Sequence, residues 1–171
     1  MESIHHEGCF VICEDALEKA CGISLNAGIA YGVLAAGTGR DHITTAWSAE
    51  AVANYSGMNW RRAKEAIQEL RAAKIITKTE GSKTRPRYRL RKPRNKLWIP
   101  TTFITGAQGE TPPIARVRQI QQIDSLFISF TLYGKQNLIE HGGLPRDLIW
   151  WKHDAEKLMT WREFNVIGFS E

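Results

Sequence analysis

The strongest constraint on the fold is a change of hydrophobic period at Lys74. Over 60–74, apolar residues recur at the three- and four-residue spacing of a helix with one buried side. Over 75–79 and again over 87–91, apolar and polar residues alternate, which predicts two strands joined through a turn at 80–83. We therefore expect an amphipathic helix that leads directly into a β-hairpin.

Start and stop signals divide the residues before this helix into short elements. Ser48 and Asn59 are favourable N-caps, and Gly57 suits a tight turn between two helices. Gly28 and Gly32 lie within an apolar helical segment, where they would let a neighbouring helix approach closely. The expected elements are a strand over 9–13, a helical turn over 14–20, a helix over 25–36, a short strand over 43–47 and a helix over 49–55.

From residue 25 onward the expected order is helix, short strand, helix, turn, helix, strand, turn, strand. This is the order of a winged helix-turn-helix, so we predict a mainly α fold with a small β component and a winged helix-turn-helix domain over 1–92.

The second half of the chain is expected to hold a separate helical unit. Prolines and glycines between 93 and 113 predict a linker over 93–112, followed by a helical unit over 113–171. The apolar stripe of this unit fits core packing, a homodimer interface through 113–138, or the first helix of a second winged-helix-like domain. The chain ends on an apolar, strand-like stretch, as expected for a piece of a longer protein. The stripe consists of Ile114, Val117, Ile120, Ile123, Phe127 and Phe130.

Positive charge is concentrated in the middle of the chain. Residues 51–100 carry a net charge of +11, against −5 for 1–50, 0 for 101–150 and −1 for 151–171. A positive field this local is typical of a face that binds a polyanion, and a solvated basic surface without a partner is the alternative. Charge alone does not decide between them, so the positions of the cations carry the argument.

The exposed side of the helix over 60–74 carries side chains that can read the edges of bases. In the major groove of DNA, Arg and Lys donate to guanine and Gln pairs with adenine. The alternative is a solvated helix face on which Glu65 and Glu69 add solubility. We expect base contacts from Trp60, Arg61, Lys64, Glu65 and Gln68.

The return strand of the hairpin is the most basic part of the chain. Eight cations and no acid lie in the fourteen residues 83–96. Alternation puts three arginines on one face of this strand and Tyr88 and Leu90 on the core face. Like charges on one face repel, so we expect a polyanion against them; a basic flexible linker is the alternative for 93–96. We expect phosphate contacts from Ser48, Asn59, Arg62, Arg71, Lys83, Arg85, Arg87, Arg89 and Arg91.

Short motifs within residues 25–90 support the same fold. They are Leu25-Asn26-Ala27, the turn over 37–41, Trp47-Ser48, Tyr55-Ser56-Gly57, Arg62-Ala63-Lys64-Glu65-Ala66-Ile67 and Arg85-Pro86-Arg87-Tyr88. In these features the chain resembles the winged-helix domains of phage, plasmid and prophage proteins, replication initiators among them. The resemblance implies sequence-specific binding to double-stranded DNA, often as a dimer, by a transcriptional regulator or replication-initiation factor of a mobile element.

Other functions are less well matched by the residues. No glycine-rich nucleotide loop ending in Lys and Ser or Thr is present, and the acids are scattered, so we expect neither an enzyme nor a cofactor or metal. Cys9, Cys13 and Cys21 do not have the spacing of a common zinc site and are expected to pack as small hydrophobes. Unpaired RNA bases stack on aromatic side chains, and such side chains are scarce in the basic half, so RNA binding is disfavoured. The main alternative to DNA binding is a protein–protein adaptor or inhibitor whose basic face binds an acidic partner.

Targeting signals are also not expected. No apolar run approaches the roughly 20 residues that cross a bilayer. The first ten residues lack the basic and apolar regions of a secretory signal. We therefore expect a cytoplasmic, nucleoid-associated protein.

Overall fold

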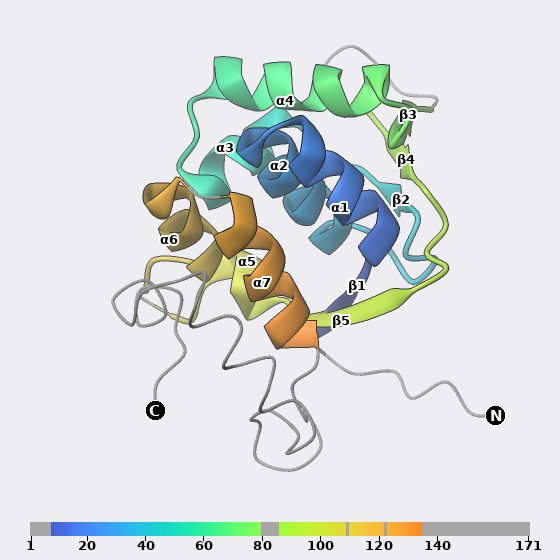
Figure 1. The fold of residues 1–171 in the computed structure, drawn as a ribbon. Coiled ribbons are helices and arrows are strands. Elements are labelled where there is room, and N and C mark those ends of the chain that lie inside the picture. The colour runs from blue at the N-terminus through green and yellow to red at the C-terminus, as the bar shows by residue number, and fades with distance from the viewer. Residues whose placement is uncertain (1–7, 80–85, 109, 122, 135–171) are drawn as a thin grey trace, which may run out of the picture.

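The computed structural model describes residues 8–79, 86–108, 110–121 and 123–134. These residues form a mainly helical fold with two small antiparallel sheets, as the sequence predicts (Figure 1). The helices are α1 (Glu14–Ile23), α2 (Leu25–Ala36), α3 (Ala49–Ser56), α4 (Trp60–Ala72), α5 (Thr102–Thr105), α6 (Pro113–Ile120) and α7 (Ile123–Gly134). The strands are β1 (Cys9–Cys13), β2 (Thr44–Thr45), β3 (Ile76–Lys78), β4 (Tyr88–Leu90) and β5 (Lys96–Pro100).

Side-chain caps begin α2, α3 and α4, and those of α3 and α4 are the predicted Ser48 and Asn59. The Ser24 hydroxyl accepts from the Ala27 N–H at 3.0 Å, and the Ser48 hydroxyl accepts from the Glu50 N–H at 3.3 Å. Asn59 Oδ1 accepts from the Arg62 N–H at 2.8 Å. Each bond satisfies one of the backbone donors that a helix leaves free at its start.

A three-stranded sheet follows α4. Its strand order is β2-β4-β3, with β4 in the centre and both neighbours antiparallel to it. Arg89 lies opposite Thr44 on one side and opposite Thr77 on the other. From α2 to β4 the elements therefore follow one another in the order that the sequence predicts.

The stretch 93–112, which we expected to be a linker, contains regular structure instead. It holds β5 and α5, and β5 pairs antiparallel with β1 so that Phe10 lies opposite Ile99. Leu97 and Phe103 are buried along with Ile99. The prolines of this stretch suggested a loop, but Pro100 stands at the last position of β5, where the strand ends anyway. The partner strand precedes β5 by more than eighty residues, so local sequence patterns did not reveal the pairing.

The glycines inside α2 let neighbouring helices pack closely against it, as expected. A Cβ at Gly28 would lie 2.7 Å from Leu126 Cδ2 of α7 and 2.8 Å from Cys21 Sγ of α1. A Cβ at Gly32 would lie 2.5 Å from the Phe130 ring. Both α1 and α7 therefore approach α2 more closely than any side chain at these positions would permit.

The apolar stripe over 114–130 packs mostly into the core of the chain itself. Ile114, Val117 and Phe130 are fully buried, and Ile123 remains 40% exposed. The stripe breaks between α6 and α7, where Gln121 has a φ of 59°. The described part of the predicted 113–138 dimer interface thus forms part of one hydrophobic cluster with α2. The sequence also predicts a helix over 144–153 and a strand-like stretch over 161–169, and both lie outside the described residues.

Candidate nucleic-acid interface

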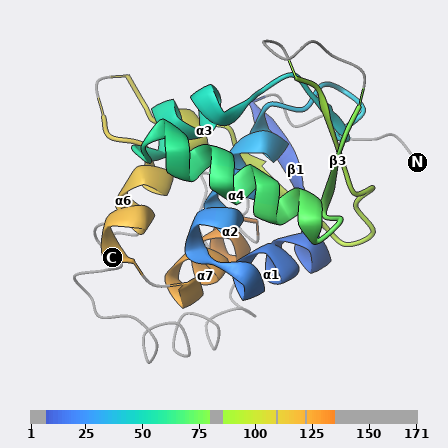
Figure 2. The same cartoon turned by 90° about the horizontal axis from the view of Figure 1, so that it is seen from above.

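Helix α4 lies across the outside of α2 and α3 (Figures 1 and 2). Its inward side consists of four buried residues at helical spacing, and its other side is open to solvent. The buried residues are Ala63, Ala66, Ile67 and Leu70. The exposed residues include Trp60, Arg61, Arg62, Lys64, Glu65, Gln68 and Arg71, so every α4 residue predicted to contact DNA is accessible.

The acids on α4 do not hold its cations firmly. Arg61 Nε lies 3.1 Å from Glu65 Oε1, but the two side chains are 88% and 54% exposed. An exposed pair of this kind contributes about 0.3–0.5 kcal/mol, so a phosphate or a base could replace either partner. Glu69 instead accepts a hydrogen bond of 2.8 Å from the Ser24 hydroxyl at the junction of α1 and α2.

Trp60 is the most exposed large apolar side chain of the described residues, at 57%. It stands in the first turn of α4, and the Lys64 ammonium lies 5.1 Å from the centre of its ring system. This cation–π contact fixes an ammonium and an indole together at the end of the helix where the backbone leaves N–H groups free. The start of α4 therefore offers an apolar surface, a cation and backbone donors in one place.

Strand β4 alternates as predicted. Tyr88 and Leu90 are buried, whereas Arg87, Arg89 and Arg91 are exposed. Thr44 and Thr77 flank Arg89 on the neighbouring strands and are exposed as well. The outer face of the sheet is therefore a basic surface with hydroxyl groups on either side.

A shallow hollow of about 530 Å³ lies on this outer face of the sheet, between Arg87, Arg89, Thr44 and Thr79. Asp41 also borders the hollow, but its Oδ1 accepts from the backbone N–H groups of Ile43 and Thr44 at 3.0 Å each. These bonds lower the pKa of the Asp41 carboxyl and tie it to its own loop.

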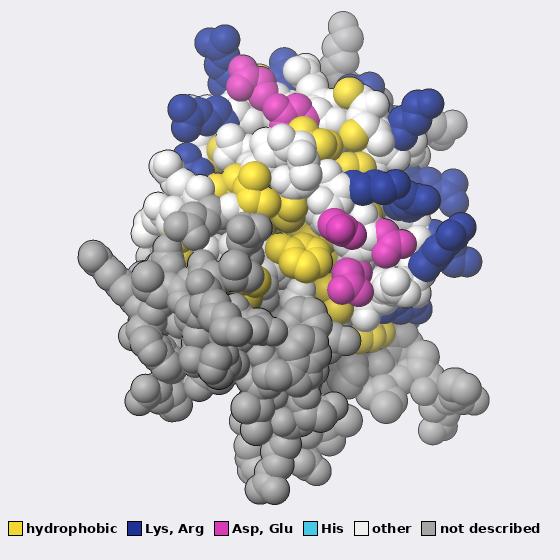
Figure 3. All heavy atoms as spheres, viewed as in Figure 1, with side chains coloured by type: hydrophobic (Ala, Val, Ile, Leu, Met, Phe, Trp, Pro, Cys, Tyr) yellow, Lys and Arg dark blue, Asp and Glu magenta, His cyan; other side chains and the backbone are white. Residues whose placement is uncertain are grey.

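The two basic surfaces meet at the C-terminal end of α4. A groove of about 470 Å³ is lined by Gln68 and Arg71 of α4 and by Thr77 and Lys78 of β3. Thr77 lies opposite Arg89 in the sheet, so this groove connects α4 with the outer face on which Arg89 stands. Figure 3 shows Lys and Arg side chains along the top and the right side of the molecule, over α4 and beside the sheet. The outer face of β4 and the exposed side of α4 are therefore neighbouring surfaces.

The remaining predicted phosphate contacts are two capping residues and two residues of the hairpin turn. Ser48 and Asn59 use their side-chain oxygens as helix caps, which leaves the Asn59 amide nitrogen and the Ser48 hydroxyl hydrogen available to a phosphate. Lys83 and Arg85 lie outside the described residues.

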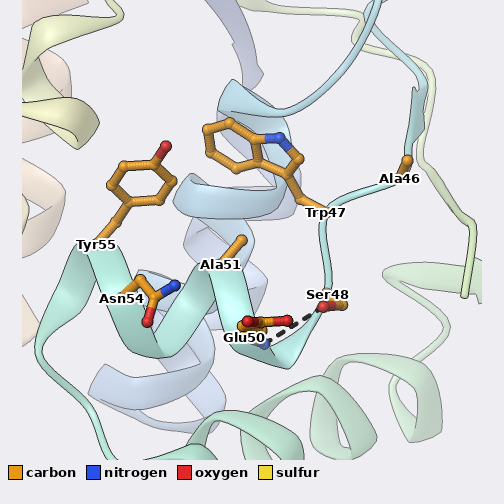
Figure 4. A pocket seen from close by; sticks show the side chains of 7 residues that line it. All are labelled: Ala46, Trp47, Ser48, Glu50, Ala51, Asn54 and Tyr55. Atoms are coloured by element: carbon orange, nitrogen blue, oxygen red, sulfur yellow. Dashed lines mark hydrogen bonds between the residues drawn. The ribbon is translucent and has the colours of Figure 1, made fainter. Parts of the chain in front are cut away.

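One further groove was not anticipated. The rings of Trp47 and Tyr55 stack with centroids 4.9 Å apart along α3, and beside them lies a groove of about 440 Å³ that Glu50 and Asn54 also line (Figure 4). Trp47 in turn covers Gly37, where a Cβ would lie 2.3 Å from the indole. Trp47 precedes Ser48, the N-cap of α3, and so lies outside the helix; its contact with Tyr55 therefore does not follow from helical spacing, and no pattern in the sequence signalled this groove.

Ion pairs do not neutralise the hairpin within the described parts of the chain. The pairs found there are Arg61–Glu65 and Arg116–Glu110, and neither involves β3 or β4. Those same residues contain no cluster of three or more His, Cys, Asp or Glu side chains that could hold a metal ion. Cys13 and Cys21 are buried in the hydrophobic cluster, which confirms their expected packing role.

Among the helices that the structure describes, none has both the length and the apolar character to cross a membrane. Comparison with protein-family models, with curated proteins and with solved structures found no match to this chain.

Proposed function

We propose that this chain binds double-stranded DNA as a winged helix-turn-helix, with α4 as the recognition helix and the β3–β4 hairpin as the wing. The observation that carries the proposal is the pair of adjoining basic surfaces on α4 and β4, whose hairpin arginines have no carboxylate partner among the described residues. The order α2-β2-α3-α4-β3-β4, with β4 in the centre of the sheet, supports it as well.

Helix α4 would read bases in the major groove. A groove about 12 Å wide admits one helix, and α4 is exposed along its outer side. Lys64 and Gln68 occupy successive turns of this side, so they would reach neighbouring base pairs, with Trp60, Arg61 and Glu65 around them. Each well-placed contact to a base contributes about 1–3 kcal/mol of discrimination.

The wing would hold the phosphate backbone. Arg87, Arg89 and Arg91 project from one face of β4, and Arg71 and Lys78 stand where this surface meets α4. Contacts to phosphates fix the register of a protein on the duplex without reading its sequence. In this proposal α4 contacts the bases, and the hairpin contacts the phosphates.

The biological role that best fits this activity is a transcriptional regulator or replication-initiation factor of a mobile element, acting at the nucleoid in the cytoplasm. A protein–protein adaptor that uses the same basic face on an acidic partner is the competing function. Repeated selection of bound duplexes from a random library tests the two. We expect a shared sequence motif to emerge within a few rounds, whereas selection without enrichment of any sequence would count against sequence-specific binding.

A further inference from the structure

Local hydrogen bonds hold the turn between α3 and α4. The Ser56 hydroxyl donates to the Val52 carbonyl at 2.5 Å and accepts from the Met58 N–H at 3.2 Å. Gly57 has a φ of 68°, and its N–H donates to the Ala53 carbonyl at 3.0 Å. This left-handed conformation ends α3 and turns the chain toward α4.

The carbonyl of Gly57 has a partner from a distant part of the chain. Arg118 Nη1, in the last turn of α6, donates to this oxygen at 2.9 Å across 61 residues of sequence. The same guanidinium stands at the C-terminal end of α3, where a cation is favoured by the helix dipole. Helix α6 also packs against α3, and its residues Ile114 and Val117 are buried in the core.

We infer that Arg118 is a positioning residue for DNA binding: it holds the α3–α4 turn and so sets the angle at which α4 meets the duplex. The inference rests on the proposed function. In this role Arg118 acts through its bond to the backbone of the turn and not through a contact with DNA. The segment over 113–134 then serves as a brace for the recognition helix in addition to completing the core.

Substitution on the same helix gives a matched comparison. Arg118→Gln removes the cation and shortens the side chain, whereas Arg118→Lys keeps a charged donor that can reach the carbonyl. Arg116→Gln is the control, because Arg116 bonds to the Thr111 carbonyl at 3.1 Å and lies 3.7 Å from Glu110, both at the start of α6.

Affinity is measured for a duplex selected by the wild-type protein, at several salt concentrations. We expect Arg118→Gln to bind about tenfold more weakly, since a charge-assisted hydrogen bond is lost, with Arg118→Lys restoring most of the affinity and Arg116→Gln within about twofold of wild type. The slope of affinity against salt should stay unchanged. A slope flatter by about 0.9 would show a direct phosphate contact and overturn the positioning role. Equal losses in Arg118→Gln and Arg116→Gln would overturn it too.

Amide hydrogen exchange of the free full chain separates this inference from the proposed function. Arg118→Gln should speed exchange at Gly57 and Met58 relative to the wild type and to Arg116→Gln, while amides of α2 keep their protection. Unchanged exchange at Gly57 and Met58 would contradict the claim that Arg118 holds the turn. A wild-type protein that selects no duplex, together with faster exchange at the turn in Arg118→Gln, would overturn DNA binding and the part of Arg118 in it, but would leave Arg118 as the residue that holds the α3–α4 turn.

Discussion

The α4–hairpin region and the α6–α7 segment carry different side chains and use them differently. On α4 and β4 the chain leaves arginines, a lysine and a tryptophan exposed, with weak or no internal partners among the described residues. On α6 and α7 it places Ile114, Val117 and Phe130 in the core. We propose that the first region binds a charged partner outside the chain, whereas the second packs into the core.

This contrast shows why the two regions respond to different changes. Packing against the glycines of α2 leaves no room for additional atoms, so the α7 contact is sensitive to volume. The cations of the basic surface are exposed, so we expect their substitution to have little effect on stability and, under the proposed function, a large effect on binding. Predictions that separate stability from binding therefore test the comparison directly.

The largest effect is expected at the α2–α7 contact. Gly32→Leu should destabilise the protein by about 3 kcal/mol, because even a Cβ at Gly32 would collide with Phe130, whose ring is itself packed against Phe103 with centroids 4.8 Å apart. Gly22→Ala in α1 is the control, since no atom lies within 4 Å of the added Cβ. It should stabilise by about 0.5 kcal/mol. Urea unfolding of both variants measures the difference, and equal stabilities would contradict the close approach of α7.

The next effect concerns the wing. Arg87→Ala combined with Arg89→Ala should weaken binding to every duplex roughly fiftyfold in 0.1 M salt and flatten the log–log salt slope by about 1.8, because two phosphate contacts are lost. The unfolding midpoint should stay close to that of the wild type. Lys19→Ala on α1 serves as the control cation and should leave the slope as it is. A double variant with the wild-type slope would show that these arginines do not contact phosphates.

A smaller effect is expected for base reading by α4. Gln68→Ala or Lys64→Ala should reduce affinity for the selected duplex about tenfold, with much less change for random duplexes, because one base contact is lost. Competition between the selected and a scrambled duplex measures this ratio. An equal loss on both sequences would reassign these side chains to the phosphate backbone.

The smallest effect concerns Asp41, which borders the arginine surface but is bonded to its own loop. Backbone N–H groups of Ile43 and Thr44 lower its pKa, so the stability they add is present above the ordinary value of 3.8 and is lost as the pH falls below it. A titration of the Asp41 carboxyl carbon by NMR should therefore give a midpoint below 3.8. A midpoint at or above that value would mean that the loop bonds do not form in solution.

Local patterns predicted the elements of the first half well, and distant pairing was harder to predict. Caps at Ser48 and Asn59, the turn at Gly57 and the alternation of β4 all depend on neighbours in sequence, so they could be predicted. The pairing of β1 with β5 depends on residues far apart in the chain, and prolines concealed β5.

For the candidate site, the sequence correctly predicted which residues of α4 and β4 are exposed, because helical and strand periods determine exposure. It did not reveal how the two basic surfaces adjoin, or that Arg118 bonds to the α3–α4 turn, since both depend on tertiary packing. The Trp47–Tyr55 stack was missed for the same reason, because Trp47 lies before α3 and only the bend of the chain at Ser48 brings its ring onto Tyr55.

The central claim is that phosphates of DNA neutralise the joined surface of α4 and the hairpin. Titration of the wild-type protein with a selected duplex at several salt concentrations tests it most directly. With roughly six phosphate contacts, the log–log slope should be about −5. Binding no tighter than micromolar at low salt, with a shallow slope, would contradict the claim.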